Sequence, residues 1–195
     1  MSTASPNLKR LVGMAILIAL IVVLQMVAGV IKVGAFSITL TLVPIVVGAA
    51  MYGAVPGCLL GLAFGAVVLM NCVSGVDPGG NMLWAANPAL TACLCLFKGG
   101  AAGFCSGLMY KLVAKKNFFA GVICAAVVCP AVNTGVFIAA MILFYRETLL
   151  LWAGETHFLT YAFVALAGVN FLIELAVNIV LSPAVIRVLK AAKKL

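Results

Sequence analysis

The chain has 195 residues, of which 66% are hydrophobic and only 8% are charged. Its mean hydropathy of +1.31 lies far outside the range of soluble globular domains and excludes that class. Twelve basic and four acidic side chains give a formal net charge of +8, which the distribution of lysines and arginines around the hydrophobic segments explains without a nucleic-acid partner.

Continuous apolar runs predict the secondary structure. A helix needs about 20 apolar residues to cross the roughly 30 Å hydrocarbon core of a bilayer, so the chain can hold about six spans and no added soluble domain. We place these spans at residues 11–31, 38–52, 55–73, 88–112, 118–144 and 158–188, of which 38–52 is short. The alternation typical of a membrane β-barrel is absent from these runs. The sequence therefore predicts an all-α integral membrane protein, a compact bundle of six transmembrane helices in a single membrane domain over residues 1–195.

Basic residues indicate how the bundle is oriented. They cluster before the first span (Lys9, Arg10), between the fourth and fifth (Lys111, Lys115, Lys116), and after the sixth (Arg187, Lys190, Lys193, Lys194). All three positions fall on one side of a six-span topology, and loops rich in Lys and Arg stay in the cytoplasm. We therefore expect both termini to be cytoplasmic and residues 74–87 and 146–157 to lie outside.

Small residues recur at every fourth position in three of the spans. The patterns are Ala15 and Ala19 in the first, Gly57, Gly61 and Gly65 in the third with Gly53 in the turn before it, and Gly99, Gly103 and Gly107 in the fourth. Helices in a bilayer associate through such faces because small side chains let the backbones approach closely. Two uses stay open, namely packing inside the bundle and docking onto another membrane subunit.

Polar residues interrupt the last span at every fourth position, at Asn170, Glu174 and Asn178. A carboxyl group inside a membrane costs at least a few kcal/mol and usually faces the bundle interior or a solute path. At about 1.5 Å per residue, Lys98, Asn133 and Asn170 all lie roughly 16–18 Å from their outer helix ends, with Glu174 one turn deeper. These groups either satisfy one another across the bundle or form a solute pocket open to the outside, and Lys98 could pair with Glu174. We expect Asn178 to serve helix packing.

The outer loop 74–87 is the expected lid of that pocket. Asp77-Pro78-Gly79-Gly80 favours a turn, and Trp84 follows it as either a ligand contact or an interfacial anchor. Asn71 adds polarity near the outer end of the third span. The candidate substrate-binding residues are therefore Lys98, Asn133, Asn170, Glu174, Trp84 and Asn71.

Three segments together resemble the substrate-binding S components of energy-coupling factor (ECF) vitamin transporters. They are the A-x-x-x-A motif of Ala15 and Ala19, the stretch ITLTLVPIVVG from Ile38 to Gly48 that continues to Tyr52-Gly53, and the ending with Asn170, Asn178 and Ser182-Pro183. The resemblance implies a subunit of a bacterial or archaeal cell membrane that captures a scarce water-soluble vitamin from outside. It also implies docking through Ala15 and Ala19 on a membrane scaffold subunit with two ATPases, followed by toppling to release the solute inward.

Energy must then come from the partner chains, because the sequence contains no G-x-x-x-x-G-K-[ST] phosphate-binding loop. The only histidine, His157, falls in a loop without an evident nucleophile or base, so we expect no enzyme, no metal site and no cofactor. The alternative is a self-sufficient secondary, proton-coupled transporter that uses Glu174, although no repeated half is evident. An unpaired Lys98 would favour a carboxylate-bearing vitamin or precursor, such as pantothenate or a folate-like compound, whereas a Lys98–Glu174 pair would suit a neutral or zwitterionic molecule.

Overall fold

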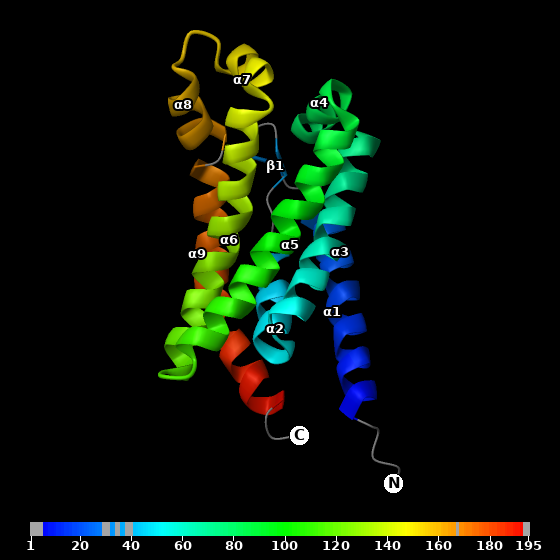
Figure 1. Ribbon diagram of the computed structural model, residues 1–195, viewed down its shortest axis with the longest axis vertical. Coiled ribbons are helices and arrows are strands. Elements are labelled where there is room, and N and C mark those ends of the chain that lie inside the picture. The colour runs from blue at the N-terminus through cyan, green and yellow to red at the C-terminus, as the bar shows by residue number, and fades with distance from the viewer. Residues whose placement is uncertain (1–5, 29–31, 34–35, 38–40, 167, 193–195) are drawn as a thin grey trace.

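A computed structural model describes residues 6–28, 32–33, 36–37, 41–166 and 168–192. The described residues form an elongated helical bundle with both termini at one end and α4, α7 and α8 at the other (Figure 1). The elements are α1 (Pro6–Ala28), β1 (Lys32–Val33), β2 (Phe36–Ser37), α2 (Leu42–Tyr52), α3 (Ala54–Ser74), α4 (Pro78–Ala86), α5 (Pro88–Val113), α6 (Phe118–Leu143), α7 (Arg146–Ala153), α8 (Phe158–Thr160), the π-helix η1 (Tyr161–Leu166) and α9 (Gly168–Ala192).

Five of the described helices are long and apolar enough to cross a membrane, namely α1, α3, α5, α6 and α9. They correspond to five of the predicted spans, which confirms a multi-pass α-helical membrane protein. Two predictions need correction. The predicted continuous span 158–188 is divided into α8, η1 and α9, and α9 begins at Gly168, a poor helix former. The predicted outer loops 74–87 and 146–157 contain the short helices α4 and α7.

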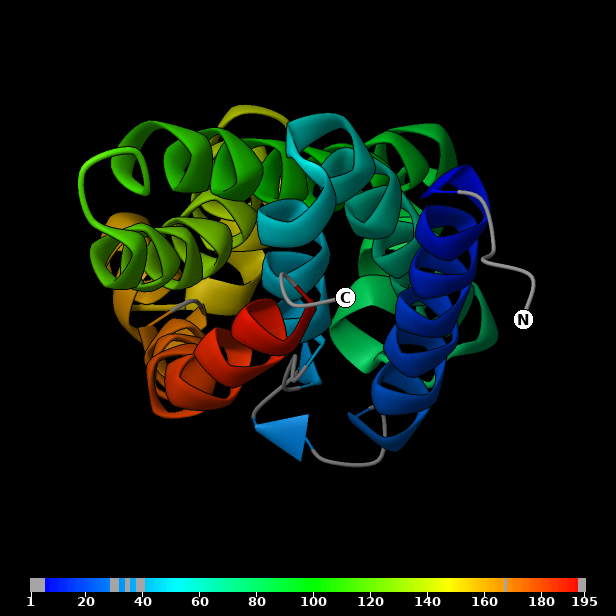
Figure 2. The ribbon, with the colours of Figure 1, turned by 90° about the horizontal axis from the view of Figure 1, so that it is seen from below.

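The predicted span 38–52 is represented by α2, which has only 11 residues. At 1.5 Å per residue it is about 16 Å long, roughly half the hydrocarbon thickness. Seen along the bundle, α2 lies near its centre, between α1 and α3 on one side and α9 on the other (Figure 2). Seven of its residues are buried, because a helix that is apolar all round is suited to the interior of a bundle. The prediction of a sixth full span is therefore not confirmed.

Two of the predicted glycine faces pack against each other where α3 and α5 cross. A Cβ atom on Gly61 would overlap the backbone of Gly99, and one on Gly99 would overlap the backbone of Gly61. Gly57 and Gly103 form the same reciprocal contact one turn away. These glycines therefore serve internal packing, the first of the two uses that the sequence left open. Gly53 instead forms the turn between α2 and α3, with a φ of 101° that favours glycine.

A buried tyrosine in the corner between α6 and α7 is hydrogen-bonded to the start of α5. The Tyr145 hydroxyl lies 2.7 Å from the Thr91 hydroxyl and donates to the Asn87 carbonyl at 3.3 Å. The Asn87 side chain in turn caps α5 by accepting from the Leu90 amide at 3.0 Å. Burial raises the pKa of Tyr145 above its ordinary value, so its phenol stays protonated at neutral pH and keeps this donor.

We expect Tyr145→Phe to lower the stability of the protein by about 1 kcal/mol, because it removes a buried hydroxyl from this network. Thermal unfolding in detergent measures the change. Tyr161→Phe is the control, since the Tyr161 hydroxyl makes no hydrogen bond with the described residues. An equal melting temperature for Tyr145→Phe and the unsubstituted protein would contradict the anchoring role.

Candidate functional site

A cavity lies between the helices towards the end of the bundle opposite the termini. Its walls come from α1, α3, α5, α6 and α9, with α4 beside them. Measured as the space open to the centre of a water-sized sphere, its volume is about 70 Å³, well above the roughly 10–15 Å³ that one water molecule requires. Its polar lining consists of Gln25, Asn71, Asp77, Thr91, Lys98, Asn133, Thr134, Asn170 and Glu174.

Five of the six predicted site residues line this one cavity: Asn71, Lys98, Asn133, Asn170 and Glu174. They come from four different helices, α3, α5, α6 and α9. Helix geometry predicted one common depth for Lys98, Asn133 and Asn170, and in the structure the three side chains line the same cavity. Substrate binding by these five residues stays a prediction.

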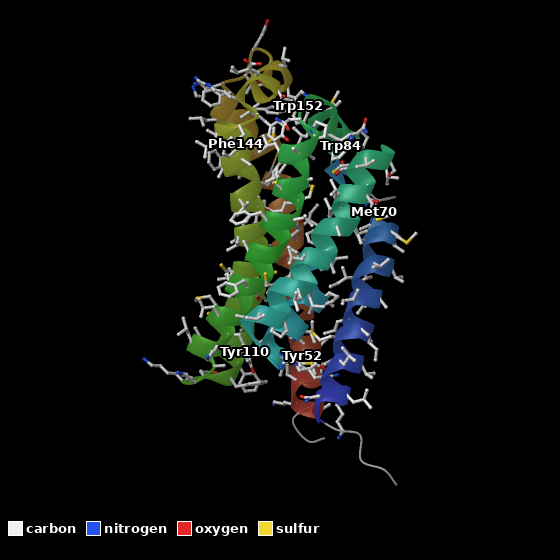
Figure 3. All side chains as sticks on the ribbon, turned by 45° about the vertical axis from the view of Figure 1, so that its right-hand side comes forward. Tyr52, Met70, Trp84, Tyr110, Phe144 and Trp152 are labelled. Atoms are coloured by element: carbon white, nitrogen blue, oxygen red, sulfur yellow. The ribbon has the colours of Figure 1, made fainter. Side chains whose placement is uncertain are left out.

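Trp84 is not among the residues that line the cavity. The residues contributed from this segment are Asp77, Gly80 and Leu83. Trp84 and Trp152 lie towards one end of the bundle, and Tyr52 and Tyr110 towards the other (Figure 3). Tryptophan and tyrosine at both ends are typical of aromatic belts at membrane surfaces, which favours the anchor alternative for Trp84.

Three amide atoms at the cavity are buried without a hydrogen-bond partner among the described residues. They are the Oδ1 atoms of Asn133 and Asn170 and the Nδ2 atom of Asn71. The Asn133 side chain is only 5% exposed. A buried polar group without a partner costs about 1–3 kcal/mol, so each such group requires an explanation. A polar solute in the cavity provides one, because its own donors and acceptors would pair with these atoms.

Among the described residues, the charged groups that line the cavity are Lys98, Asp77 and Glu174. The Lys98 ammonium lies 5.4 Å from the centre of the Phe137 ring, a distance at which a cation is attracted to the aromatic face. Asp77 is 8% exposed and Glu174 4%, so both carboxyl groups are removed from bulk water. The Lys98–Glu174 ion pair stays a prediction.

Sequence reasoning missed several lining residues. Asp77 stands in a turn-forming sequence where an acidic residue is ordinary, although it is one of just four acidic residues in the chain. Gln25, only 3% exposed, accepts a hydrogen bond from the Thr41 hydroxyl at 2.8 Å and so connects α1 to the start of α2 beside the cavity. Cys72 and Cys95 are buried free thiols in the same wall. Their polarity is weak, so no sequence signal separates them from packing residues.

Asn178, which we expect to serve helix packing, is only 2% exposed. Its Nδ2 atom donates to the Glu174 carbonyl of the same helix at 2.8 Å, and the Ser182 hydroxyl continues the pattern by donating to the Asn178 carbonyl. Such bonds to the preceding turn are a local use of polar side chains within one helix. Asn178 does not line the cavity.

Ala15 and Ala19 are both exposed on α1. They therefore contribute little to the packing of this chain, in contrast to the glycines of α3 and α5. Large apolar neighbours on the same helix are exposed as well, including Ile16 at 62% and Met26 at 66%. This surface faces lipid or another membrane protein.

Comparison with known proteins shows which family the chain belongs to. No curated protein and no solved structure matches the chain. The profile of the family described as ECF transporter, substrate-specific component, matches residues 9–186, which is nearly the whole chain. The chain therefore belongs to the substrate-specific components of ECF transporters, membrane proteins that bind the transported substrate and are not enzymes.

Proposed function

We propose that this chain is the high-affinity capture subunit of an ECF-type ABC importer in the cell membrane. It binds a water-soluble vitamin or a related small solute in the cavity beneath α4 and delivers it together with a scaffold subunit and two ATPase subunits. The observation that carries this proposal is the convergence of Asn71, Lys98, Asn133, Asn170 and Glu174 on one cavity. Polar groups from four helices meet there inside an otherwise apolar bundle, as a solute site requires.

The distribution of basic residues supports an outward-facing cavity. Lys9 and Arg10 precede the apolar part of α1, Lys111 lies in the last turn of α5, and Arg187 and Lys190 lie in the last turns of α9. These positions are all towards the end of the bundle that carries the termini (Figure 1). The positive-inside rule assigns that end to the cytoplasm, so the cavity at the opposite end opens to the outside.

The family favours this function over a self-sufficient proton-coupled carrier that would use Glu174. A substrate-specific component supplies binding, and the sequence has no phosphate-binding loop of its own. ATP hydrolysis then belongs to partner chains. Glu174 serves the solute site in this proposal and carries no proton across the membrane.

Mass spectrometry of the solute that copurifies with the detergent-extracted protein tests the function directly. We expect one small molecule to be retained, and calorimetric titration with that molecule then gives the affinity. Asn133→Ala and Asn170→Ala should each weaken binding about tenfold, because loss of one hydrogen bond in a buried site is worth about 1.4 kcal/mol.

Asn7→Ala is the matched control, because Asn7 is exposed in the first turn of α1 at the other end of the bundle. It should bind like the unsubstituted protein. Unchanged affinity in both cavity variants would overturn the site. A protein that retains no solute and shows no thermal stabilisation by any water-soluble vitamin would overturn the capture function itself.

A further inference from the structure

The acidic residues of this chain are concentrated at the cavity. The sequence has 12 basic but only four acidic side chains, and two of the four, Asp77 and Glu174, line this one site. Both are more than nine-tenths buried. The other two, Glu147 and Glu155, are exposed beyond the end of α6. Burying a carboxyl group is costly, so a basic protein that buries half of its carboxyl groups in one cavity requires a reason specific to that cavity.

The amide groups of the cavity add further acceptors. The Oδ1 atoms of Asn133 and Asn170 are both buried without a partner among the described residues, and both side chains line the cavity. The Nδ2 atom of Asn71 is the one amide donor in the same condition. The unsatisfied amide atoms therefore call for a ligand with more hydrogen-bond donors than acceptors.

Lys98 is the single basic residue among the described residues that line the cavity, and its ammonium already lies against the Phe137 ring. With both carboxyl groups ionised, the described residues of the lining carry two negative charges and one positive charge, a formal sum of −1. An anionic solute would add a second negative charge at short range, where the effective dielectric is well below that of water. Placing like charges together in a buried site costs several kcal/mol, whereas a cation would neutralise the excess.

From these observations we propose that the captured solute carries a protonated nitrogen at neutral pH. This inference rests on the proposed capture function. The nitrogen and its N–H groups face Asp77, Glu174 and the amide oxygens of Asn133 and Asn170. A zwitterion fits as well, with its carboxylate on Lys98. This substrate class differs from the carboxylate-bearing vitamin that Lys98 alone favours, because Asp77 adds a second carboxyl group to the cavity.

The copurified solute, identified by mass spectrometry, gives the first test. A molecule with an amine or ring nitrogen that is protonated or permanently charged at pH 7 supports the inference. An anion without such a nitrogen overturns it, while leaving the capture function intact. Absence of any bound solute counts against the capture function instead, so the two failures are distinguishable.

Thermal shift with a matched pair of probes gives a second test. Pyridoxamine and 4-pyridoxate share a ring, but one carries an ammonium and the other a carboxylate. Greater stabilisation by 4-pyridoxate than by pyridoxamine would contradict the inference, whereas the reverse order supports it.

Neutralising the carboxyl groups completes the test. Asp77→Asn and Glu174→Gln should each weaken binding of the copurified solute at least tenfold, measured by calorimetric titration in folded, monodisperse protein. Glu155→Gln removes the same charge at an exposed position and should change the affinity less than twofold. Having two cavity variants keeps the test valid if one of them fails to fold. Unchanged affinity in every cavity variant that folds would overturn the assignment.

Discussion

Replacing Gly61 by alanine is expected to destabilise the protein by about 3 kcal/mol and to abolish most solute binding. A Cβ atom at this position would overlap the carbonyl group of Gly99, and backbone atoms cannot move aside as a flexible side chain can. Overpacking of a close contact costs typically 1–3 kcal/mol. The crossing of α3 and α5 also sets the distance between Asn71 and Lys98 across the cavity, so separation of the two helices should distort the site. Thermal unfolding and solute titration in detergent measure the two effects.

Gly135→Ala provides the control on another membrane-spanning helix. A Cβ atom on Gly135 would meet nothing within 4 Å, so the added methyl group has room. Alanine is a better helix former than glycine by up to about 1 kcal/mol, and we expect this variant to be neutral or slightly more stable. Equal melting temperatures for Gly61→Ala and Gly135→Ala would show that the glycine contact does not hold α3 and α5 together.

Most of the fold could be predicted because crossing a membrane demands long apolar runs, and five such runs correspond to helices that meet the length criterion. The run that contains α2 is just as apolar, but hydropathy cannot tell a short helix surrounded by other helices from a short span. The division before α9 was missed for a related reason. An apolar sequence is compatible with either an α-helix or a π-helix, and the choice depends on tertiary packing.

The candidate site was predictable where polar residues stand inside apolar spans. Asn133, Asn170 and Glu174 are conspicuous there because each costs free energy in lipid, and each lines the cavity. Asp77 and Trp84 fall in an outer segment where polar and aromatic residues are ordinary, so their composition carries little information. Only the fold of α4 decides that Asp77 faces the cavity and Trp84 does not.

The substitution expected to have the largest effect on transport is Ala15→Trp combined with Ala19→Trp. We expect it to abolish uptake in cells that supply the ECF partner subunits, while the purified variant binds its solute with unchanged affinity. Both alanines are exposed on α1 and lie away from the cavity, so indole rings there should leave the site intact. They would, however, prevent the close helix approach that a small-x-x-x-small face permits. Uptake of labelled solute and calorimetric titration separate these two effects.

A second pair of tryptophans distinguishes a specific docking surface from a general effect of bulky side chains facing lipid. Ala176 and Val180 are exposed at the same four-residue spacing on α9, so Ala176→Trp with Val180→Trp adds equivalent rings to another helix. This control should retain uptake and binding. If the α1 variant loses binding together with uptake, its alanines serve internal structure. If it keeps both, docking does not depend on the face formed by Ala15 and Ala19. Only loss of uptake with intact binding identifies that face as the surface that engages the scaffold.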